Sequence, residues 1–356
     1  MNATNARSRP AQPKGILYVG MDLGTSRTSI AASNGVRETV ASYVGYPKDV
    51  VARKALKKDV LFGDEALANR LALNLYRPLS GGVIQHSDAA ADSAEAKAYL
   101  KAAQELIRHA VGLARPQADE LVYAVIGCPA QCSIKNKSAI LEAARPVVDS
   151  VMIVSEPFTV AYGIDQLADC LVIDIGAGTT DLCRMRGAMP TAEDQLTTTF
   201  AGDHVDRTLE ALLKKKCVGA SFSIHAIKEL KERFSTVSDS KEPVWFEVPV
   251  AGKPTRFEVG HELREACRSI VPSMVDAIHQ LIASYDPDFQ SRLKNRVLLG
   301  GGGSQMGGLR EMLEAEMKQR LGEGRVLRVD EPTYGGANGA LKIAHDMPPE
   351  FWEKLS

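Results

Sequence analysis

Two short loops of the sequence combine aspartate, glycine and hydroxyl residues directly after an apolar segment. The first reads Asp-Leu-Gly-Thr-Ser over residues 22–26, and the second reads Asp-Ile-Gly-Ala-Gly-Thr-Thr over residues 174–180. Glycine lets backbone N–H groups approach an anion without an intervening side chain, and such a turn can form an anion-binding nest. The neighbouring serine and threonine hydroxyls add further donors. The pattern predicts that both loops bind phosphate groups.

The aspartates of these loops indicate a second chemistry. A carboxylate repels a phosphate, but carboxylate and water oxygens are the ligands that Mg²⁺ prefers. We therefore expect Asp22 and Asp174 to hold, through water, a Mg²⁺ ion that bridges the phosphates. One such loop alone is more often a tight hairpin than a phosphate site. Two matching loops 152 residues apart favour a duplicated domain with one phosphate loop in each half.

Two further segments could contribute to the same chemistry. Glu156 follows an apolar strand-like run and precedes Pro157, which suits the first turn of a helix. A carboxylate there can position a water for attack on a terminal phosphate, although by itself the segment favours a glutamate that interacts with the helix dipole. Four glycines at residues 300–303 follow another apolar run. They either allow a flat ring or ribose to lie on the backbone or form a flexible turn.

Strand-like and helix-like segments alternate along the chain, which favours an α/β fold. Strands are expected at residues 16–19, 28–33, 121–126, 151–154, 171–175 and 297–299. Helices are expected at residues 94–113, 139–148, 205–215, 223–234, 262–284 and 308–321. Two segments resemble insertions: residues 46–76, with a helix opening at Gly63, and residues 242–259, an antiparallel pair turning at Gly252 and Lys253.

Composition excludes several classes of partner and location. The chain has 43 lysines and arginines against 44 aspartates and glutamates, so its net charge of −1 gives no general attraction to nucleic acid. No apolar run is long enough to span a bilayer, and residues 1–14 lack the apolar core of a secretory signal. The six cysteines show no zinc-site spacing and are expected to be reduced, mostly buried thiols. A cytoplasmic protein with a disordered N-terminal tail is expected.

The order of these motifs resembles the superfamily of actin, sugar kinases and heat-shock chaperones, from about residue 17 to residue 341. There they are the phosphate-1 loop, the connecting segment with the catalytic acid, the phosphate-2 loop and the adenosine loop. The resemblance implies an α/β actin-like ATPase fold, with two duplicated RNase H-like domains flanking a nucleotide cleft. It divides the chain into a disordered tail (1–14), subdomain IA (15–45 and 77–153, with a return at about 333–347), subdomain IB (46–76), subdomain IIA (154–201 and 262–332), subdomain IIB (202–261) and a C-terminal tail (348–356).

Within the superfamily, the chain is most similar to the MreB-like bacterial actins, and among these to the magnetosome filament proteins. The segments at residues 44–50, 62–67, 154–158 and 337–341 carry this closer match. The resemblance implies binding of ATP or ADP with Mg²⁺, and hydrolysis of ATP by water to ADP and phosphate. Glu156 would orient the attacking water, and Asp174 would act with it. Nucleotide-binding roles are implied for Asp22, Gly24, Thr25, Ser26, Gly176, Ala177, Gly178, Thr179, Thr180, Lys228, Glu229, Gly301, Gly302, Gly303 and Met306.

Three functions compete on this fold. The resemblance implies a homopolymeric filament in the cytoplasm, alongside magnetosome membranes and bound to an adaptor protein at that membrane. A small-metabolite kinase would need a substrate pocket, and the insertions at residues 46–76 and 202–259 are small for that purpose. A chaperone ATPase would carry a substrate domain after the nucleotide domain, whereas this chain ends at Ser356. The filament protein is therefore the favoured hypothesis.

Overall fold

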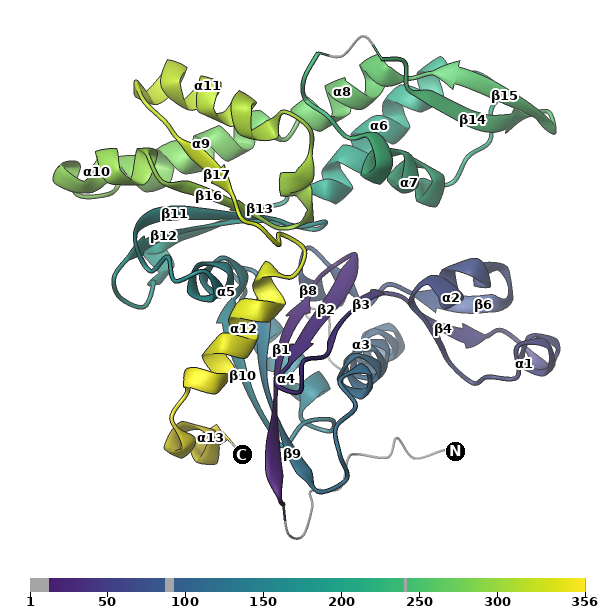
Figure 1. The fold of residues 1–356 in the computed structure, drawn as a ribbon. Helices are drawn as coiled ribbons and strands as arrows, with labels where there is room; N and C mark the ends of the chain where they lie inside the picture. Colours follow the sequence, from purple (N-terminus) through teal and green to yellow (C-terminus); the bar gives the residue numbers. More distant parts are fainter. Residues whose placement is uncertain (1–12, 87–92, 240–241, 356) are drawn as a thin grey trace. The chain divides into compact units, whose positions relative to one another are not determined.

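The computed structural model describes residues 13–86, 93–239 and 242–355 (Figure 1). The predicted tail at 1–14 therefore lies almost wholly outside the described residues. The chain forms two compact units. Unit 1 runs to Leu167 and resumes at Thr333, and unit 2 comprises residues Ala168–Pro332.

Each unit contains a five-stranded sheet, and the two sheets have the same topology. In unit 1 the strand order is β10 (Ser150–Ser155), β9 (Glu120–Cys128), β1 (Gly15–Leu23), β2 (Arg27–Ala32) and β3 (Arg37–Ala41). In unit 2 the corresponding strand order is β17 (Val326–Arg328), β16 (Val297–Gly300), β11 (Ala168–Ile175), β12 (Thr180–Arg186) and β13 (Gln195–Thr198). In both, the first three strands along the chain pair antiparallel and the last two add in parallel. The duplicated architecture predicted from the two loops is confirmed.

Five helices accompany the sheet of unit 1: α3 (Ala94–Leu113), α4 (Ile134–Ala144), α5 (Glu156–Gly163), α12 (Gly335–Asp346) and α13 (Pro349–Leu355). Helix α12 lies against β1 (Figure 1) so closely that a Cβ on Gly20 would come 2.1 Å from the Ala337 carbonyl oxygen. Helix α5 packs on α12, where Gly163 and Gly339 meet backbone to backbone. Residues 154–167 belong to unit 1, whereas the sequence analysis assigned them to subdomain IIA.

An ordered helix follows α12, which corrects the C-terminal tail predicted for residues 348–356. Residues Pro349–Leu355 form α13, and Trp352 is only 1% exposed. Its ring stacks on Tyr123 of β9 with centroids 4.9 Å apart, and its carbonyl oxygen accepts a hydrogen bond from the Ser150 hydroxyl. A short helix of this length needs such packing because it is marginal in isolation.

The described residues of unit 2 form the α-helices α6 (Gly202–Lys216), α7 (Ile224–Phe234), α8 (Gly260–Arg268), α9 (Val271–Ala283), α10 (Pro287–Lys294) and α11 (Leu309–Leu321). The single helix predicted over 262–284 is wrong, because the structure has two helices there. Pro272 lies in the first turn of α9, where its missing N–H group costs nothing, but it could not continue the preceding helix. The predictions at 205–215, 223–234 and 308–321 are confirmed as α6, α7 and α11.

Two small antiparallel elements extend the units. In unit 1, β4 (Val44–Pro47), β5 (Leu61–Phe62) and β6 (Leu73–Tyr76) form a sheet with α1 (Val50–Leu56) and α2 (Gly63–Ala68), around a core that includes Tyr43, Leu61 and Leu73. Strands β7 (Leu79–Ser80) and β8 (Val83–Ile84) make a short hairpin beyond it. In unit 2, β14 (Trp245–Val250) and β15 (Lys253–Glu258) pair antiparallel, as predicted, with Gly252 at a positive φ of 80°.

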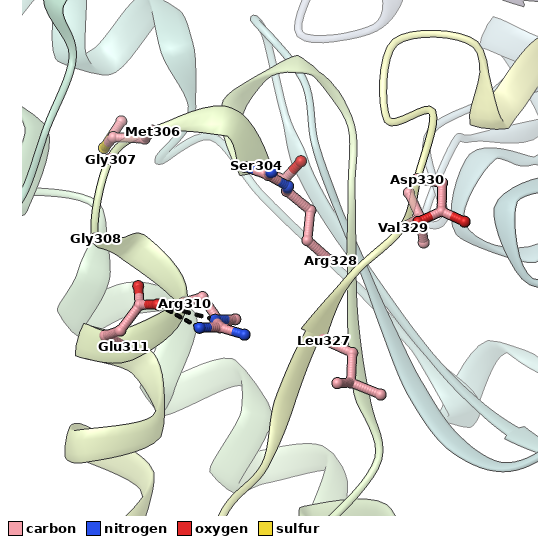
Figure 2. A pocket seen from close by; sticks show the side chains of 10 residues that line it. All are labelled: Ser304, Met306, Gly307, Gly308, Arg310, Glu311, Leu327, Arg328, Val329 and Asp330. Carbon is pink, nitrogen blue, oxygen red and sulfur yellow. Dashed lines mark hydrogen bonds and ion pairs between the residues drawn. The ribbon is translucent and has the colours of Figure 1, made fainter.

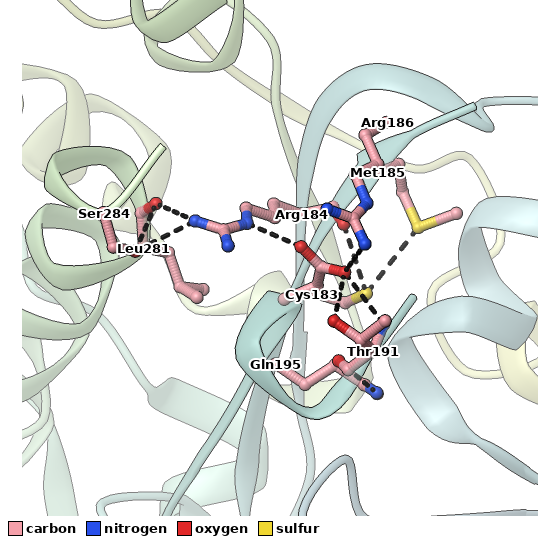
Figure 3. A network of polar contacts seen from close by, with 9 residues as sticks. Cys183, Arg184, Met185, Arg186, Thr191, Gln195, Leu281 and Ser284 are labelled. Carbon is pink, nitrogen blue, oxygen red and sulfur yellow. Dashed lines mark hydrogen bonds and ion pairs between the residues drawn. The ribbon is translucent and has the colours of Figure 1, made fainter. Parts of the chain in front are cut away.

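A buried ion pair fastens the sheet of unit 2 to its helices (Figure 3). The Arg184 Nε atom lies 2.7 Å from Asp194 Oδ1, and the side chains are 5% and 0% exposed. Arg184 also donates to the Leu281 carbonyl and the Ser284 hydroxyl, each at 2.9 Å, at the end of α9. The Thr191 N–H and hydroxyl donate to Asp194 Oδ2. Strand β12, the turn before β13 and the end of α9 are thereby joined.

The cysteines agree with the sequence analysis. All six cysteines are free thiols, and five of them are buried. Within the residues that the structure describes, no helix is both long and apolar enough to cross a membrane.

Candidate functional site

The first predicted phosphate loop connects β1 to β2 and is held by contacts from several elements of unit 1. Asp22 lies near the end of β1, opposite Gly127 of β9. The Thr25 hydroxyl accepts a hydrogen bond from the Gly82 N–H at 2.8 Å, and the Gly24 carbonyl accepts one from the Ser42 hydroxyl at 2.7 Å. A Cβ on Gly24 would lie 2.5 Å from the Arg27 carbonyl oxygen, so only glycine fits this tight turn.

Unit 1 brings Glu156 to the same sheet edge as Asp22. Strand β9 lies between them, because Gly127 pairs with Asp22 on one side and with Val154 of β10 on the other. Glu156 begins α5 at the end of β10 and is 8% exposed. A Cβ on Gly127 would come 3.2 Å from Glu156 Cγ. The predicted water-orienting residue and the predicted metal-binding residue therefore lie two strands apart at one edge.

Two glycines at this edge were given no role by the sequence analysis. The missing Cβ of Gly127 leaves room for Glu156. A Cβ on Gly336, in the first turn of α12, would lie 3.1 Å from Asp22 Oδ2. A glycine at the end of a buried strand, as at 127, is a signal that could have pointed to a close approach. The second contact joins residues more than 300 positions apart in the sequence, so no local pattern carries it.

The second predicted loop connects β11 to β12 in unit 2, and its backbone carbonyls accept hydrogen bonds that fix its conformation. The Gly176 N–H donates to the Thr179 carbonyl at 2.9 Å and closes the turn. The first turn of α6 then binds two loop carbonyls, because the Gly202 N–H donates to Gly176 at 3.1 Å and the Asp203 N–H donates to Ala177 at 2.7 Å. Carbonyls that accept bonds from α6 point at α6, and so away from any anion on the opposite side of the loop.

The threonines of this loop differ in their contacts. Thr180 is fully buried and its hydroxyl donates to the Phe200 carbonyl at 2.9 Å. Its proton is thus committed to a backbone acceptor, and the phosphate role predicted for Thr180 stays a prediction. Thr179 is 5% exposed, and its carbonyl closes the turn.

The glycine run lies directly against the second loop. Asp174 of β11 pairs with Gly300 of β16, and Gly301 follows with a positive φ of 73°. A Cβ on Gly301 would come 2.3 Å from Asp174 Oδ1, whereas one on Gly302 would meet no atom within 4 Å. The structure therefore brings together Asp174 and the predicted adenosine loop, and it leaves open space beside Gly302.

A cavity of about 540 Å³ lies next in the chain after the glycine run, and its lining begins at Ser304 (Figure 2). Ser304, Met306 and the turn before α11 form one wall, and β17 with Asp330 forms the other. Among the lining residues, Arg310 Nη2 lies 2.6 Å from Glu311 Oε1 in an ion pair. Met306 contributes to this cavity, while Gly301, Gly302 and Gly303 are not among the residues that line it.

Helix α7 carries the residues predicted to face the purine and ribose. Lys228 lies 3.8 Å from Glu232 in an i,i+4 pair, and Glu229 is exposed. The sequence analysis overlooked Lys231 on the same helix, whose Nζ lies 2.8 Å from Asp206 Oδ1 of α6. Lys231 follows the buried Ile227 and Leu230 of α7, so its place on the inward face of this amphipathic helix was a usable signal.

The oxygen atoms of the two loops have the chemistry that a hydrated Mg²⁺ ion requires. Asp22 and Asp174 supply hard carboxylate oxygens, and the glycines beside them keep bulk away from those oxygens. In the described ranges, no three His, Cys, Asp or Glu side chains gather closely enough to hold a metal ion directly. Each carboxylate by itself has oxygen atoms that suit a hydrated Mg²⁺ ion, and the metal role of Asp22 and Asp174 stays a prediction.

Comparison with known proteins decides the family. The model of the MreB/Mbl protein family matches residues 17–348. The chain belongs to the MreB/Mbl family. Its similarity to bacterial actins and its actin-like α/β fold are thereby confirmed.

Individual relatives of this MreB/Mbl-family chain extend over nearly its whole length. The actin-like protein MamK of Paramagnetospirillum magneticum is 36% identical over 344 residues, which cover 97% of this chain and 96% of that protein. A solved MamK double helical filament superposes with a TM-score of 0.88 at 36% identity, covering 93% of this chain and 99% of that one. A non-polymerising MamK mutant bound to AMPPNP gives a TM-score of 0.68, also at 36% identity, with the same coverage.

Proposed function

We propose that this chain binds ATP, hydrolyses it to ADP and phosphate, and polymerises into cytoskeletal filaments that organise or position magnetosomes in chains. The observation that supports polymerisation most is the likeness to the subunit of the MamK double helical filament, which extends over 99% of that chain. A small-metabolite kinase or a chaperone ATPase is not favoured, because relatives that match almost the whole chain are actin-like MamK proteins.

Residues of both units take part in nucleotide binding in this proposal. The backbone of Gly24 and Thr25 in unit 1, and of Gly176 to Thr179 in unit 2, would bind the phosphates. The space beside Gly302 would admit the ribose or base, and Lys228 and Glu229 of α7 would contact it. Asp22 and Asp174 would hold Mg²⁺ through water, and the ion would neutralise phosphate charge.

Glu156 would orient the attacking water. Glu156 directly follows β10 as the first residue of α5. The helix turn that follows is fixed because the Thr159 hydroxyl donates to the Glu156 carbonyl at 2.7 Å. The missing Cβ of Gly127 leaves the room that the Glu156 side chain occupies. A carboxylate held in this way can accept a proton from water or align it for in-line attack.

Polymerisation would place subunits head to tail in a heterologous contact that does not close into a ring. The filament would lie in the cytoplasm alongside magnetosome membranes, to which an adaptor protein at that membrane would attach it. Because the two phosphate loops belong to different units, hydrolysis could change the contacts that each unit makes with the nucleotide. Such a change gives the ATP state a route to control filament stability.

Sedimentation tests this function directly. Purified protein should pellet with Mg-ATP and with Mg-AMPPNP, and negative-stain microscopy should show filaments in the pellet. Phosphate release should follow assembly with ATP only, and Glu156→Gln should slow that release while the protein still pellets. A monomer that stays in the supernatant at high concentration with either nucleotide would overturn the filament proposal.

A further inference from the structure

A buried ion pair between α6 and α7 lies next to the second phosphate loop. Lys231 Nζ lies 2.8 Å from Asp206 Oδ1, and the two side chains are 12% and 6% exposed. Lys231 also donates to the Gly202 carbonyl at 3.2 Å. Burial raises the pKa of the Asp206 carboxyl, and the charge of Lys231 opposes that rise. The lysine thus stabilises a carboxylate that burial alone disfavours.

The turn that Lys231 contacts is the turn that holds the loop. The N–H groups of Gly202 and Asp203 bind the carbonyls of Gly176 and Ala177. A Cβ on Gly202 would meet Ala177 Cα at 3.2 Å and Lys231 Nζ at 3.3 Å. Gly202 therefore lies in close contact with both the loop and the lysine. Nothing larger than glycine fits at position 202 without moving the lysine or the loop.

Peptide planarity carries this restraint to the other side of the loop. In a trans peptide the C=O of one residue and the N–H of the next point in opposite directions within one plane. Because α6 holds the carbonyls of Gly176 and Ala177, the N–H groups of Ala177 and Gly178 must point away from α6. Those N–H groups are the donors that an anion nest would present to a phosphate.

We propose that Lys231 is a positioning residue for the second phosphate loop: paired with Asp206, it fixes the first turn of α6 and thereby directs the Ala177 and Gly178 N–H groups at the phosphates of the nucleotide. The proposal rests on the ATP-binding function proposed above. It assigns Lys231 no contact with the nucleotide. Its effect should therefore fall on the phosphate chain and spare the nucleoside.

The test compares two ligands by calorimetry with the full chain. Lys231→Met should weaken binding of Mg-AMPPNP on the order of 10- to 100-fold, because a small misplacement of a binding group has effects of that size. Binding of adenosine should change little. Lys231→Arg keeps the charge and should recover most of the AMPPNP affinity. Lys214→Met is the matched control, since it removes an exposed ion pair with Glu210 on the same helix α6 and should alter neither affinity.

A second variant covers the case in which Lys231→Met does not fold. The double variant Asp206→Asn/Lys231→Met removes both charges, which spares the fold the cost of an unpaired buried charge, but it still lacks the bond to Gly202. It should melt close to wild type and bind AMPPNP weakly. Wild-type AMPPNP affinity in a folded Lys231→Met or double variant would overturn the inference, as would an equal loss for adenosine. Failure of the wild-type protein to bind AMPPNP would instead overturn the proposed function.

Discussion

The Glu156 side chain lies against Gly127, with only 3.2 Å between Glu156 Cγ and the position of a Cβ on that glycine. Gly127 is also the residue of β9 that pairs with Asp22. One glycine therefore makes room for the predicted water-orienting carboxylate beside the predicted metal-binding strand end. Its missing side chain is a determinant of where Glu156 can lie.

Gly127→Ala should displace Glu156 and slow ATP turnover on the order of 10- to 100-fold. Affinity for Mg-AMPPNP should change much less, because the variant leaves both phosphate loops in place. Gly112→Ala on α3 is the control, since a Cβ there meets no atom within 4 Å. Steady-state phosphate release and calorimetry measure the two effects. Unchanged turnover in Gly127→Ala and in Glu156→Gln would show that the attacking water is positioned elsewhere.

Gly301→Ala should destabilise unit 2 even without ligand. Its Cβ would come 2.3 Å from Asp174 Oδ1, and the backbone at φ 73° and ψ 163° lies in a region that is essentially restricted to glycine, which adds strain of about 1–3 kcal/mol for a residue with a side chain. Gly302→Ala is the informative comparison, because its Cβ meets open space. That variant should keep the wild-type melting temperature but bind AMPPNP more weakly if the nucleotide occupies the space. Equal melting temperatures for both variants would contradict the steric argument.

Asp194→Asn should destabilise the protein at neutral pH, by about 3–5 kcal/mol, because it leaves Arg184 buried without its charge partner. Burial tends to raise the pKa of Asp194, but hydrogen bonds from Thr191 and Arg184 outweigh it and hold the pKa below its usual value. A lowered pKa gives stability that is present above the unfolded-state pKa and is lost as the pH falls through the folded-state pKa.

The difference between wild type and Asp194→Asn should therefore be largest near neutral pH and shrink in acid, below the ordinary aspartate pKa of about 4. Urea denaturation at a series of pH values measures it. An exposed pair provides the control: Asp276→Asn, which loses a contact with Arg320 on the surface, should cost less than about 1 kcal/mol. A difference for Asp194→Asn that is constant across the pH range would contradict the assigned ionisation.

Trp352→Ala should destabilise unit 1 by about 3–5 kcal/mol, the range for removing a large buried aromatic side chain. Trp352 is 1% exposed and stacks on Tyr123. Phe351→Ala, one position earlier, should cost little because Phe351 is 49% exposed. Thermal denaturation compares the two variants. Similar losses for both would indicate that α13 is held by general hydrophobic contact rather than by the tryptophan.

The sequence determined those features that a single segment encodes. Asp22 and Asp174, each at the end of an apolar run and before glycines, were enough to predict a duplicated fold with one loop in each half, and in the structure each loop joins two antiparallel strands. The alternation of apolar and polar residues over 242–259 likewise predicted the antiparallel pair of β14 and β15. These patterns are local because hydrophobic periodicity and turn residues act within a few positions.

Only the tertiary structure decided which distant residues meet. The assignment of α5 to unit 1 depends on the backbone contact between Gly163 and Gly339, and α13 exists because Trp352 reaches Tyr123. The Lys231–Asp206 pair and the approach of Gly301 to Asp174 join helices and strands that are separate in the chain. Such contacts depend on how elements pack, and the free energy of a buried charge or a missing Cβ is set by neighbours that no local segment contains.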